Sequence, residues 1–332
     1  MKTMGTTDKI LVVGAAGMVG SALVRSLLAH GFGNILGTIH CKLPDFGQGA
    51  EGRVRLERLD LMDQTAVRDF FDRERPSHVF LAAAKVGGIH ANNTYPADFI
   101  HANLVMQANV IHSAYESGVK HLLFLGSSCI YPRECPQPIR ESYLLSGPLE
   151  ATNRPYAVAK IAGIEMCWAY NRQYGTRYLA VMPTNLYGPG DNYDLQTSHV
   201  LPALIRKAHE AKVRGDRMFT VWGTGAPRRE FLYSDDLAGA CVFLMTETGK
   251  TAALLNDHEP PLVNIGCGKD VTIAELARMV AEVVGFGGEI VFDAGKPDGT
   301  PQKLLDVSRM KGMGWRPSVA LPEGIGMIYR DF

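Results

Sequence analysis

The sequence lacks an excess of either charge, since 34 Lys and Arg residues balance 34 Asp and Glu residues. This balance gives no general electrostatic reason to expect nucleic acid or a membrane surface as a partner. The sequence also lacks a long uncharged apolar span and an apolar signal-peptide core at its start. We therefore expect a cytoplasmic protein that acts on a small molecule.

Cysteine is sparse, with six residues scattered along 332 positions. No two of them have the paired spacing of a metal site, and the segment from Cys129 to Cys135 is too loose for a zinc knuckle. We expect reduced thiols and no bound metal. Internal repeats and low-complexity tracts are also absent.

What the chain does contain is a series of short apolar runs, at Ile10–Val13, Ile35–Ile39, Val79–Ala82, Leu122–Leu125 and Tyr178–Met182. Such runs are typical of strands buried on both faces of a parallel sheet. Amphipathic segments lie between them, among them Ser21–His30, Thr65–Arg73 and Ala102–Gly118. The alternation predicts an α/β, doubly wound parallel sheet of the Rossmann type.

The sequence pattern changes after about Pro183, where turn-rich segments separate shorter predicted elements. We expect residues 1–182 to form the dinucleotide-binding domain, joined by returning segments near 231–247 and 262–267. Residues 183–332 would mainly form a smaller substrate-binding lobe over the carboxyl ends of the sheet. Residues Pro44–Gly52 are expected to form a surface loop.

A glycine-rich turn follows the first apolar run. Gly14, Gly17 and Gly20 stand at the start of a predicted helix, where Met18 and Val19 would also face a dinucleotide diphosphate. A purely structural turn is the alternative, and three glycines alone do not exclude it. Their GxxGxxG spacing is the form that short-chain dehydrogenase/reductases use.

The end of the second strand indicates which dinucleotide is bound. An NAD site would place an acidic residue there, but no acid occurs before Asp45. His40 and Lys42 offer cations for a 2′-phosphate instead, which favours NADP(H). Asp60 is a candidate for contact with the adenine, whereas Asp63 is equally well explained as a helix N-cap.

Tyr156 and Lys160 are four residues apart, which puts both side chains on one helical face. There the ammonium could lower the pKa of the phenol and make it a proton donor to a carbonyl oxygen. Ser127 would supply a second hydrogen bond to that oxygen, and Cys129 and His199 a further acid/base pair. Each has an alternative explanation. Tyr156 and Lys160 could be a surface pair on a helix, Cys129 could be a thiol that only fills space in the core, and His199 could be a helix-start residue without chemistry.

Arg229 has the planar fork that suits phosphate recognition. An ordinary salt bridge to Glu230 or Asp236 is its alternative explanation.

Eight segments carry a resemblance to the GDP-L-fucose synthase family of extended short-chain dehydrogenase/reductases, over about Ile10 to Trp315. They are Ala82–Gly88, Asn92–Pro96, Gly126–Pro132, Tyr156–Lys160, Met182–Pro189, Ser198–Pro202, Val221–Gly225 and Lys296–Pro301. The Ser-Ser-Cys-Ile-Tyr-Pro and Ser-His-Val-Leu-Pro sequences are far more specific than the glycine turn.

The resemblance implies conversion of GDP-4-keto-6-deoxy-D-mannose to GDP-L-fucose, by epimerisation at carbons 3 and 5 and reduction at carbon 4 with NADPH. By family match, Cys129 is the base, His199 is the acid, and Lys160 also holds the nicotinamide ribose.

Further matched cofactor positions are Ala83, Ala84, Pro183, Asn185 and Leu186. Matched substrate positions are Lys207, Trp222, Arg229 and Asp298. The family also implies a homodimer built from two long helices, here Ala102–Gly118 and Ala157–Tyr174.

The sequence departs from some bacterial members in two places. Their glycine loop carries an arginine for the 2′-phosphate, whereas this loop has Ala15 and Ala16, and residues 43–56 resemble an insertion. Other NAD(P)-dependent nucleotide-sugar epimerases or reductases of the same fold are the nearest alternative, for example a UDP-hexose 4-epimerase. Cys129 and His199 argue against that enzyme, and the tyrosine and lysine argue against a non-catalytic dinucleotide sensor.

Overall fold

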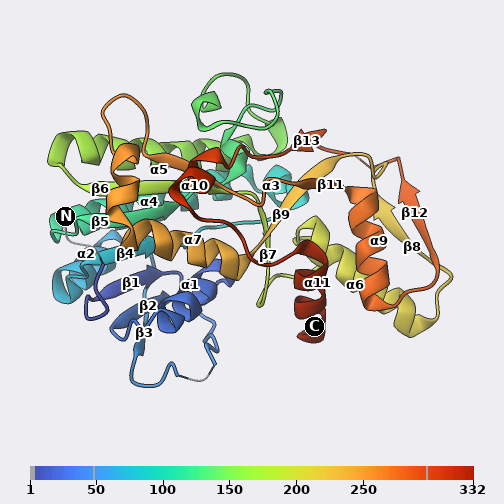
Figure 1. Cartoon of the computed structure of the whole chain (residues 1–332), viewed down its shortest axis with the longest axis horizontal. Coiled ribbons are helices and arrows are strands. Elements are labelled where there is room, and N and C mark those ends of the chain that lie inside the picture. The colour runs from blue at the N-terminus through green and yellow to red at the C-terminus, as the bar shows by residue number, and fades with distance from the viewer. Residues whose placement is uncertain (1–3, 48, 297) are drawn as a thin grey trace.

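A seven-stranded parallel β-sheet forms the centre of the larger lobe (Figure 1). The computed structural model describes residues 4–47, 49–296 and 298–332. In order across the sheet, the strands are β10 (Leu262–Ile265), β6 (Arg177–Pro183), β5 (His121–Leu125), β4 (His78–Leu81), β1 (Ile10–Val13), β2 (Ile35–Ile39) and β3 (Val54–Arg58). The strand order reverses between β1 and β4, which opens a crevice at their carboxyl ends. The predicted doubly wound fold is confirmed.

Helices cover both faces of this sheet, which explains the unbroken apolar runs. α1 (Met18–Ala29) and α7 (Ser234–Thr246) pack on one face, and α2 (Gln64–Glu74), α4 (Pro96–Glu116) and α5 (Arg154–Tyr174) pack on the other. Along β1, Ile10 and Val12 join the first core, whereas Leu11 and Val13 join the second. Burial of one such side chain contributes roughly 1.5–3 kcal/mol.

The smaller lobe has its own apolar core, built on three helices. They are α6 (Val200–Arg214), α9 (Ile273–Val284) and α11 (Leu321–Arg330). Its strands are β7 (Asn185–Tyr187), β8 (Met218–Trp222), β9 (Arg228–Tyr233), β11 (Asp270–Thr272), β12 (Glu289–Asp293) and β13 (Gln302–Lys303). β9 pairs with β7, β11 and β13, and β8 pairs with β12.

Short helices connect these parts. They are α3 (Ile89–Thr94), α8 (Thr248–Thr251), α10 (Ser308–Met313) and the 3₁₀ turns η1 (Ser128–Ile130), η2 (Glu141–Tyr143), η3 (Ala151–Asn153) and η4 (Ala252–Leu254). Two elements from the second half of the chain belong to the larger lobe, because β10 pairs with β6 and α7 packs on α1. Within the described ranges, no helix is long and apolar enough to cross a membrane.

The segment that resembles an insertion, residues 43–56, ends within the central sheet. Residues Val54–Leu56 already belong to β3, which pairs with β2 from Val54 opposite Ile35 onward. β3 is an edge strand with three charged residues, so it lacks the apolar run that marks the central strands. The predicted loop at Pro44–Gly52 is present, although Gln48 lies outside the described residues.

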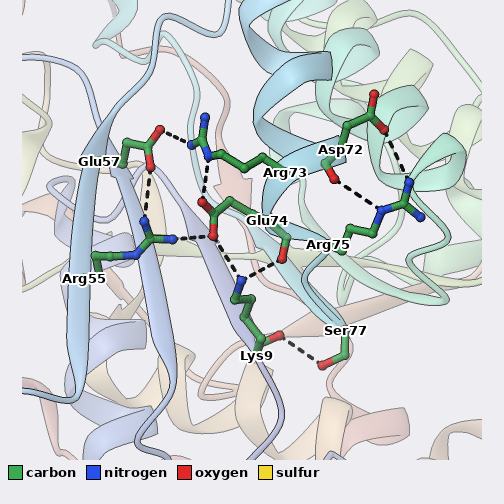
Figure 2. A network of polar contacts seen from close by, with 8 residues as sticks. All are labelled: Lys9, Arg55, Glu57, Asp72, Arg73, Glu74, Arg75 and Ser77. Carbon is green, nitrogen blue, oxygen red and sulfur yellow. Dashed lines mark hydrogen bonds and ion pairs between the residues drawn. The ribbon is translucent and has the colours of Figure 1, made fainter.

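A polar network ties the end of α2 to the start of β1 and to β3 (Figure 2). The carboxylate of Glu74 is buried and accepts hydrogen bonds from Lys9 at 3.0 Å, from Arg73 at 2.9 Å and from Arg55. Burial alone would raise the pKa of Glu74, but the hydrogen bonds from Arg73 and Lys9 prevail and lower it to about 2. Through Lys9, which directly precedes β1, the network reaches the amino-terminal end of that strand.

Candidate active site

The predicted cofactor residues gather at one edge of the sheet. Gly14 follows β1, His40 follows β2, Ala83 and Ala84 follow β4, and Pro183 ends β6. Because all these strands are parallel, their carboxyl ends meet at the same edge. Residues that lie far apart in the sequence thus line one crevice.

The glycine turn is shaped for close approach of an anion. Gly14 has a φ of +86°, and a Cβ on it would lie 2.9 Å from the backbone that follows β4. A Cβ on Gly20 would lie 2.0 Å from the carbonyl oxygen of Gly14. Gly17 caps α1 without a side-chain hydrogen bond, so the N–H groups of the first turn, which Met18 and Val19 begin, are free for a diphosphate.

Two basic side chains follow β2 directly. His40 and Lys42 are both exposed, and the sulfur of Cys41 lies 3.1 Å from Nδ1 of His40. Cationic groups at this strand end suit a 2′-phosphate better than a free ribose hydroxyl. The residues present therefore fit NADP(H).

The two aspartates after β3 have different structural roles. Asp63 is the N-cap of α2, since its Oδ1 accepts from the N–H of Ala66 at 3.0 Å. Asp60 accepts from the N–H of Met62 at 2.9 Å and shapes the turn before the helix. The capping explanation of Asp63 is confirmed, and contact of Asp60 with the adenine stays a prediction.

Asn185 and Leu186 lie on β7, immediately beyond the end of β6. The side-chain amide of Asn185 donates to the carbonyl oxygen of Glu230 at 2.9 Å, and the hydroxyl of Thr184 donates to the same oxygen at 3.1 Å. These bonds fasten the cofactor edge of the sheet to β9 of the smaller lobe.

The catalytic candidates meet where β5 ends against α5. Ser127 caps η1 and accepts from the N–H of Cys129 at 3.5 Å. On α5, Nζ of Lys160 donates to the carbonyl oxygen of Leu125 at 2.8 Å and lies 5.9 Å from the ring centre of Tyr156. Lys160 is only 3% exposed, so the surface-pair alternative is wrong.

The structure also corrects the expected effect of Lys160 on Tyr156. Burial raises the pKa of Tyr156, as does the nearby Cys129, and the hydrogen bond with Ser127 offsets only part of this. Burial lowers the pKa of Lys160 to about 8. The ammonium of Lys160 is hydrogen-bonded to a backbone carbonyl and does not lower the pKa of the Tyr156 phenol. Burial has the largest effect on that pKa, although the two residues are neighbours on the helix.

Cys129 is buried among charged and polar groups, which distinguishes it from a filler thiol. It is 6% exposed, and burial raises its pKa. Lys303, Ser127 and Lys160 act in the opposite direction and lower it. A thiol in such surroundings can become a thiolate when further negative charge is removed from the pocket or further positive charge enters it.

His199 is the N-cap residue of α6 and makes no capping hydrogen bond with its side chain. The loop before it contacts the segment after β4, where the N–H of Gly88 donates to the carbonyl oxygen of Thr197 at 3.1 Å. The residue as a whole is exposed, yet burial of the imidazole by the surrounding protein lowers its pKa. Both observations fit a side chain that protein partly covers and that solvent still reaches.

The substrate candidates on the smaller lobe surround an exposed tryptophan. Trp222 is 56% exposed, and the Nζ of Lys207 lies 5.1 Å above its ring while donating to the carbonyl oxygen of Thr220 at 3.0 Å. Asp298 accepts from the N–H and the hydroxyl of Thr224, at 2.7 and 2.8 Å. Asp298 therefore orders the turn after β8. Pro297 beside it lies outside the described residues.

Arg229 is half-buried on β9, and its guanidinium donates to the carbonyl oxygen of Arg228 at 2.8 Å. Neither expected salt bridge forms. The carboxylate of Glu230 accepts backbone N–H groups at 2.6 and 3.0 Å, and that of Asp236 accepts from Ser318. Arg229 is thus left available for an anion.

Two residues of the site have no pattern that reveals them in the sequence. Glu230 is fully buried, and its carboxylate joins β9 to the segments after β10 and β13. Lys303 lies on β13 opposite Arg229. Only its position two residues after the Lys296–Pro301 segment could have drawn attention to it.

Comparisons with known proteins agree with this geometry. Residues 10–266 match the family model of the NAD dependent epimerase/dehydratase family. GDP-L-fucose synthase 1 of Arabidopsis thaliana is 55% identical over 97% of this chain and 92% of that protein. The GDP-L-fucose synthase of Escherichia coli K12 is 50% identical over 98% and 96%.

Among solved structures, MlghC, a GDP-mannoheptose C4 reductase from Campylobacter jejuni with NADP bound, superposes with a TM-score of 0.82. It is 36% identical, and the match covers 98% of both chains. The chain therefore belongs to the NAD-dependent epimerase/dehydratase family and groups with its GDP-L-fucose synthases.

Proposed function

We propose that this protein converts GDP-4-keto-6-deoxy-D-mannose to GDP-L-fucose, by epimerisation at carbons 3 and 5 followed by reduction at carbon 4. The observation that carries the proposal is the position of Cys129 next to Ser127, Tyr156 and Lys160. Reduction alone needs only the last three residues, so an added thiol indicates a second proton-transfer reaction. The names of the most similar relatives specify the sugar nucleotide.

Tyr156 and Ser127 serve both reactions through one oxygen atom. Removal of a proton next to a ketone produces an enolate, whose negative oxygen is stabilised by hydrogen-bond donors held in place beforehand. The raised pKa of Tyr156 keeps the phenol protonated, as a donor requires. The same phenol then gives its proton to the oxygen at carbon 4 during reduction.

Cys129 removes the proton as a base, and His199 returns one from the opposite face, which inverts the carbon. Each acid or base contributes about 10²- to 10⁴-fold to the rate. NADPH, when bound, supplies the hydride for carbon 4. Lys160 holds the nicotinamide ribose, and His40 and Lys42 bind the 2′-phosphate.

Arg229 and Lys207 bind the diphosphate of the sugar nucleotide, because both are cations without a carboxylate partner at ion-pair distance among the described residues. Trp222 offers an exposed aromatic face, and Asp298 holds the turn behind it.

We take residues 1–182, with returns near 231–247 and 262–267, as the cofactor domain and the rest mainly as the substrate lobe. We also propose a cytoplasmic location.

We propose that the working form is a homodimer through α4 and α5. From residue 99 to 115, α4 contains no Lys, Arg, Asp or Glu. Leu104, Val105 and Ala108 form a partly exposed stripe at helical spacing, and Val158 on α5 is 39% exposed. A second copy of the same helix pair would cover this apolar face.

The test is to mix the purified protein with GDP-4-keto-6-deoxy-D-mannose and to supply NADPH or NADH in separate runs. We expect one equivalent of cofactor to be oxidised per sugar consumed, faster with NADPH, as followed by nicotinamide absorbance. Turnover without net oxidation would indicate an isomerase that retains its cofactor. No turnover would remove the assignment of the substrate.

A further inference from the structure

Two cations lie side by side at the centre of the site. β13 and β9 are parallel neighbours (Figure 1). Lys303 pairs with Arg229 across them, so both side chains project from the same face of the small sheet. Among the described residues, Lys303 has no hydrogen bond or ion pair with any carboxylate. Two half-buried cations without such partners indicate a place where negative charge develops.

The backbone around Lys303 is held from both sides. The N–H of Leu304 donates to the side chain of Gln137 at 2.9 Å, and the N–H of Leu305 donates to the carboxylate of Glu230 at 3.0 Å. The side chain of Gln302 donates to Asp270 at 2.6 Å, on the other face of the strand. Lys303 therefore points in a fixed direction, away from Asp270.

The loop that carries Cys129 packs along this strand. Its later part bonds to the residue that follows the strand, where the N–H of Ile139 donates to the carbonyl oxygen of Leu304 at 2.7 Å. The hydroxyl of Tyr131, two residues after Cys129, donates to Asn264 at 2.6 Å, and the amide of Asn264 donates to the carbonyl oxygen of Ile139 at 2.9 Å. This chain of bonds connects the thiol segment rigidly to β13.

We propose that Lys303 is a positioning residue for the epimerisation, whose ammonium stabilises the Cys129 thiolate that removes protons next to the ketone. Lys303, Lys160 and Ser127 act electrostatically or by hydrogen bond on the thiol, and the thiol in turn acts on Tyr156. Burial raises the pKa of the thiol, and Lys303 is the strongest influence that lowers it. Lys160 is less free for this role because its ammonium is bound to a backbone carbonyl.

The groups that face Lys303 are consistent with this role. Burial lowers the pKa of its ammonium and Arg229 lowers it further, whereas Cys129, Glu150 and Cys135 raise it. Each proton taken from the sugar converts the thiolate to a thiol, and the thiol loses that proton to solvent before the next cycle. In the proposed cycle, Lys303 acts through its charge and takes no part in the proton transfer itself.

The first experiment measures the ionisation of Cys129 without any sugar. The ultraviolet absorbance of the thiolate is titrated with pH, and the titration of a matching Cys129→Ser protein is subtracted. We expect Lys303→Met to move the Cys129 titration to higher pH, whereas Lys303→Arg keeps it near that of the unmodified protein. Lys250→Met is the matched control, because Lys250 is exposed on α8 and pairs with Glu247. An unchanged titration in Lys303→Met would overturn the proposal.

The second experiment follows deuterium entry from heavy water at carbons 3 and 5, and it rests on the proposed function for its substrate. We expect exchange on the order of tenfold slower in Lys303→Met at neutral pH, recovering as the pH rises. If only the KM for the sugar rises while exchange at saturation is unchanged, Lys303 binds the diphosphate and the proposal is wrong. Lys303→Gln replaces Lys303→Met if that variant does not fold. Because the titration needs no sugar, it tests Lys303 even if the substrate assignment fails.

Discussion

At the scale of single residues, the proposed site depends on the thiol of Cys129, whose pKa is shifted in opposite directions by its surroundings. Burial raises the pKa of Cys129, while Lys303, Ser127 and Lys160 lower it. A thiol on the surface would be open to oxidation and to unwanted reactions. A buried thiol with charged neighbours reacts mainly when a substrate completes the pocket.

Replacement of Cys129 by serine separates the two reactions. A serine hydroxyl is a far weaker acid than a thiol, so we expect deuterium exchange at carbons 3 and 5 to fall about 10²- to 10⁴-fold. Binding of NADPH, measured by fluorescence titration, should not change, because Cys129 lies apart from the glycine turn. Cys267→Ser is the control, since that thiol is half-buried and donates to the carbonyl oxygen of Lys269 as a hydroxyl also would. Normal exchange in Cys129→Ser would remove Cys129 from the role of base.

The sequence predicted which residues meet but not how they ionise. The spacing of Tyr156 and Lys160 on one helix follows from local geometry, so their joint position could be read directly. The pKa of Tyr156 depends on burial by distant segments, and here the prediction had the wrong direction. Lys303 was missed for the same reason, because only the pairing of β13 with β9 brings it to the site.

At the scale of elements, most of the central strands could be predicted because each is buried on both faces and appears in the sequence as an apolar run, whereas their order across the sheet comes only from the structure. β3 escaped this pattern since it lies at the edge and carries Arg55, Glu57 and Arg58. The glycine turn could be predicted from the sequence because its backbone conformation favours glycine, as the φ of +86° at Gly14 shows.

The network around Glu74 holds α2 against the sheet, and we expect it to make stability depend on acid. The folded pKa of about 2 lies below the ordinary value of 4.5, so the stabilisation is present above the ordinary pKa and is lost as the pH falls toward 2. Glu74→Gln should lower the free energy of unfolding by about 2 kcal/mol at neutral pH, allowing for the half-exposed arginines.

Asp72→Asn provides a matched control for that change (Figure 2). Asp72 pairs with Arg75 at 4.0 Å on the surface, so its loss should alter stability by less than about 0.5 kcal/mol. Urea unfolding at neutral pH and near pH 3 measures both variants. If Glu74→Gln and the unmodified protein lose stability equally between these pH values, the network does not cause the acid dependence.

At the scale of the whole molecule, backbone and side-chain bonds connect the carboxyl ends of the central strands to β9 and β13, which carry the cations Arg229 and Lys303. Asn185 and Thr184 fasten the end of β6 to β9, and Glu230 fastens β9 to the segment after β13. The proposed catalytic residues and the proposed diphosphate-binding residues therefore rest on a connected backbone. Such a frame would keep one ketone oxygen at Tyr156 while two neighbouring carbons are inverted, as the proposed function requires.

α5 connects this frame to the proposed dimer, because it carries Tyr156 and Lys160 on its inner side and Val158 on its outer side. A charge introduced on the stripe would be buried without a partner in the dimer, so Val105→Glu should yield monomers in sedimentation velocity. Val213→Glu changes an exposed valine on α6, 72% accessible, and should leave the dimer intact. If the unmodified protein sediments as a monomer at assay concentrations, the apolar stripe does not bind a second copy. If Val105→Glu is monomeric and slower, the partner helices help to hold α5, and with it the tyrosine and lysine, in place.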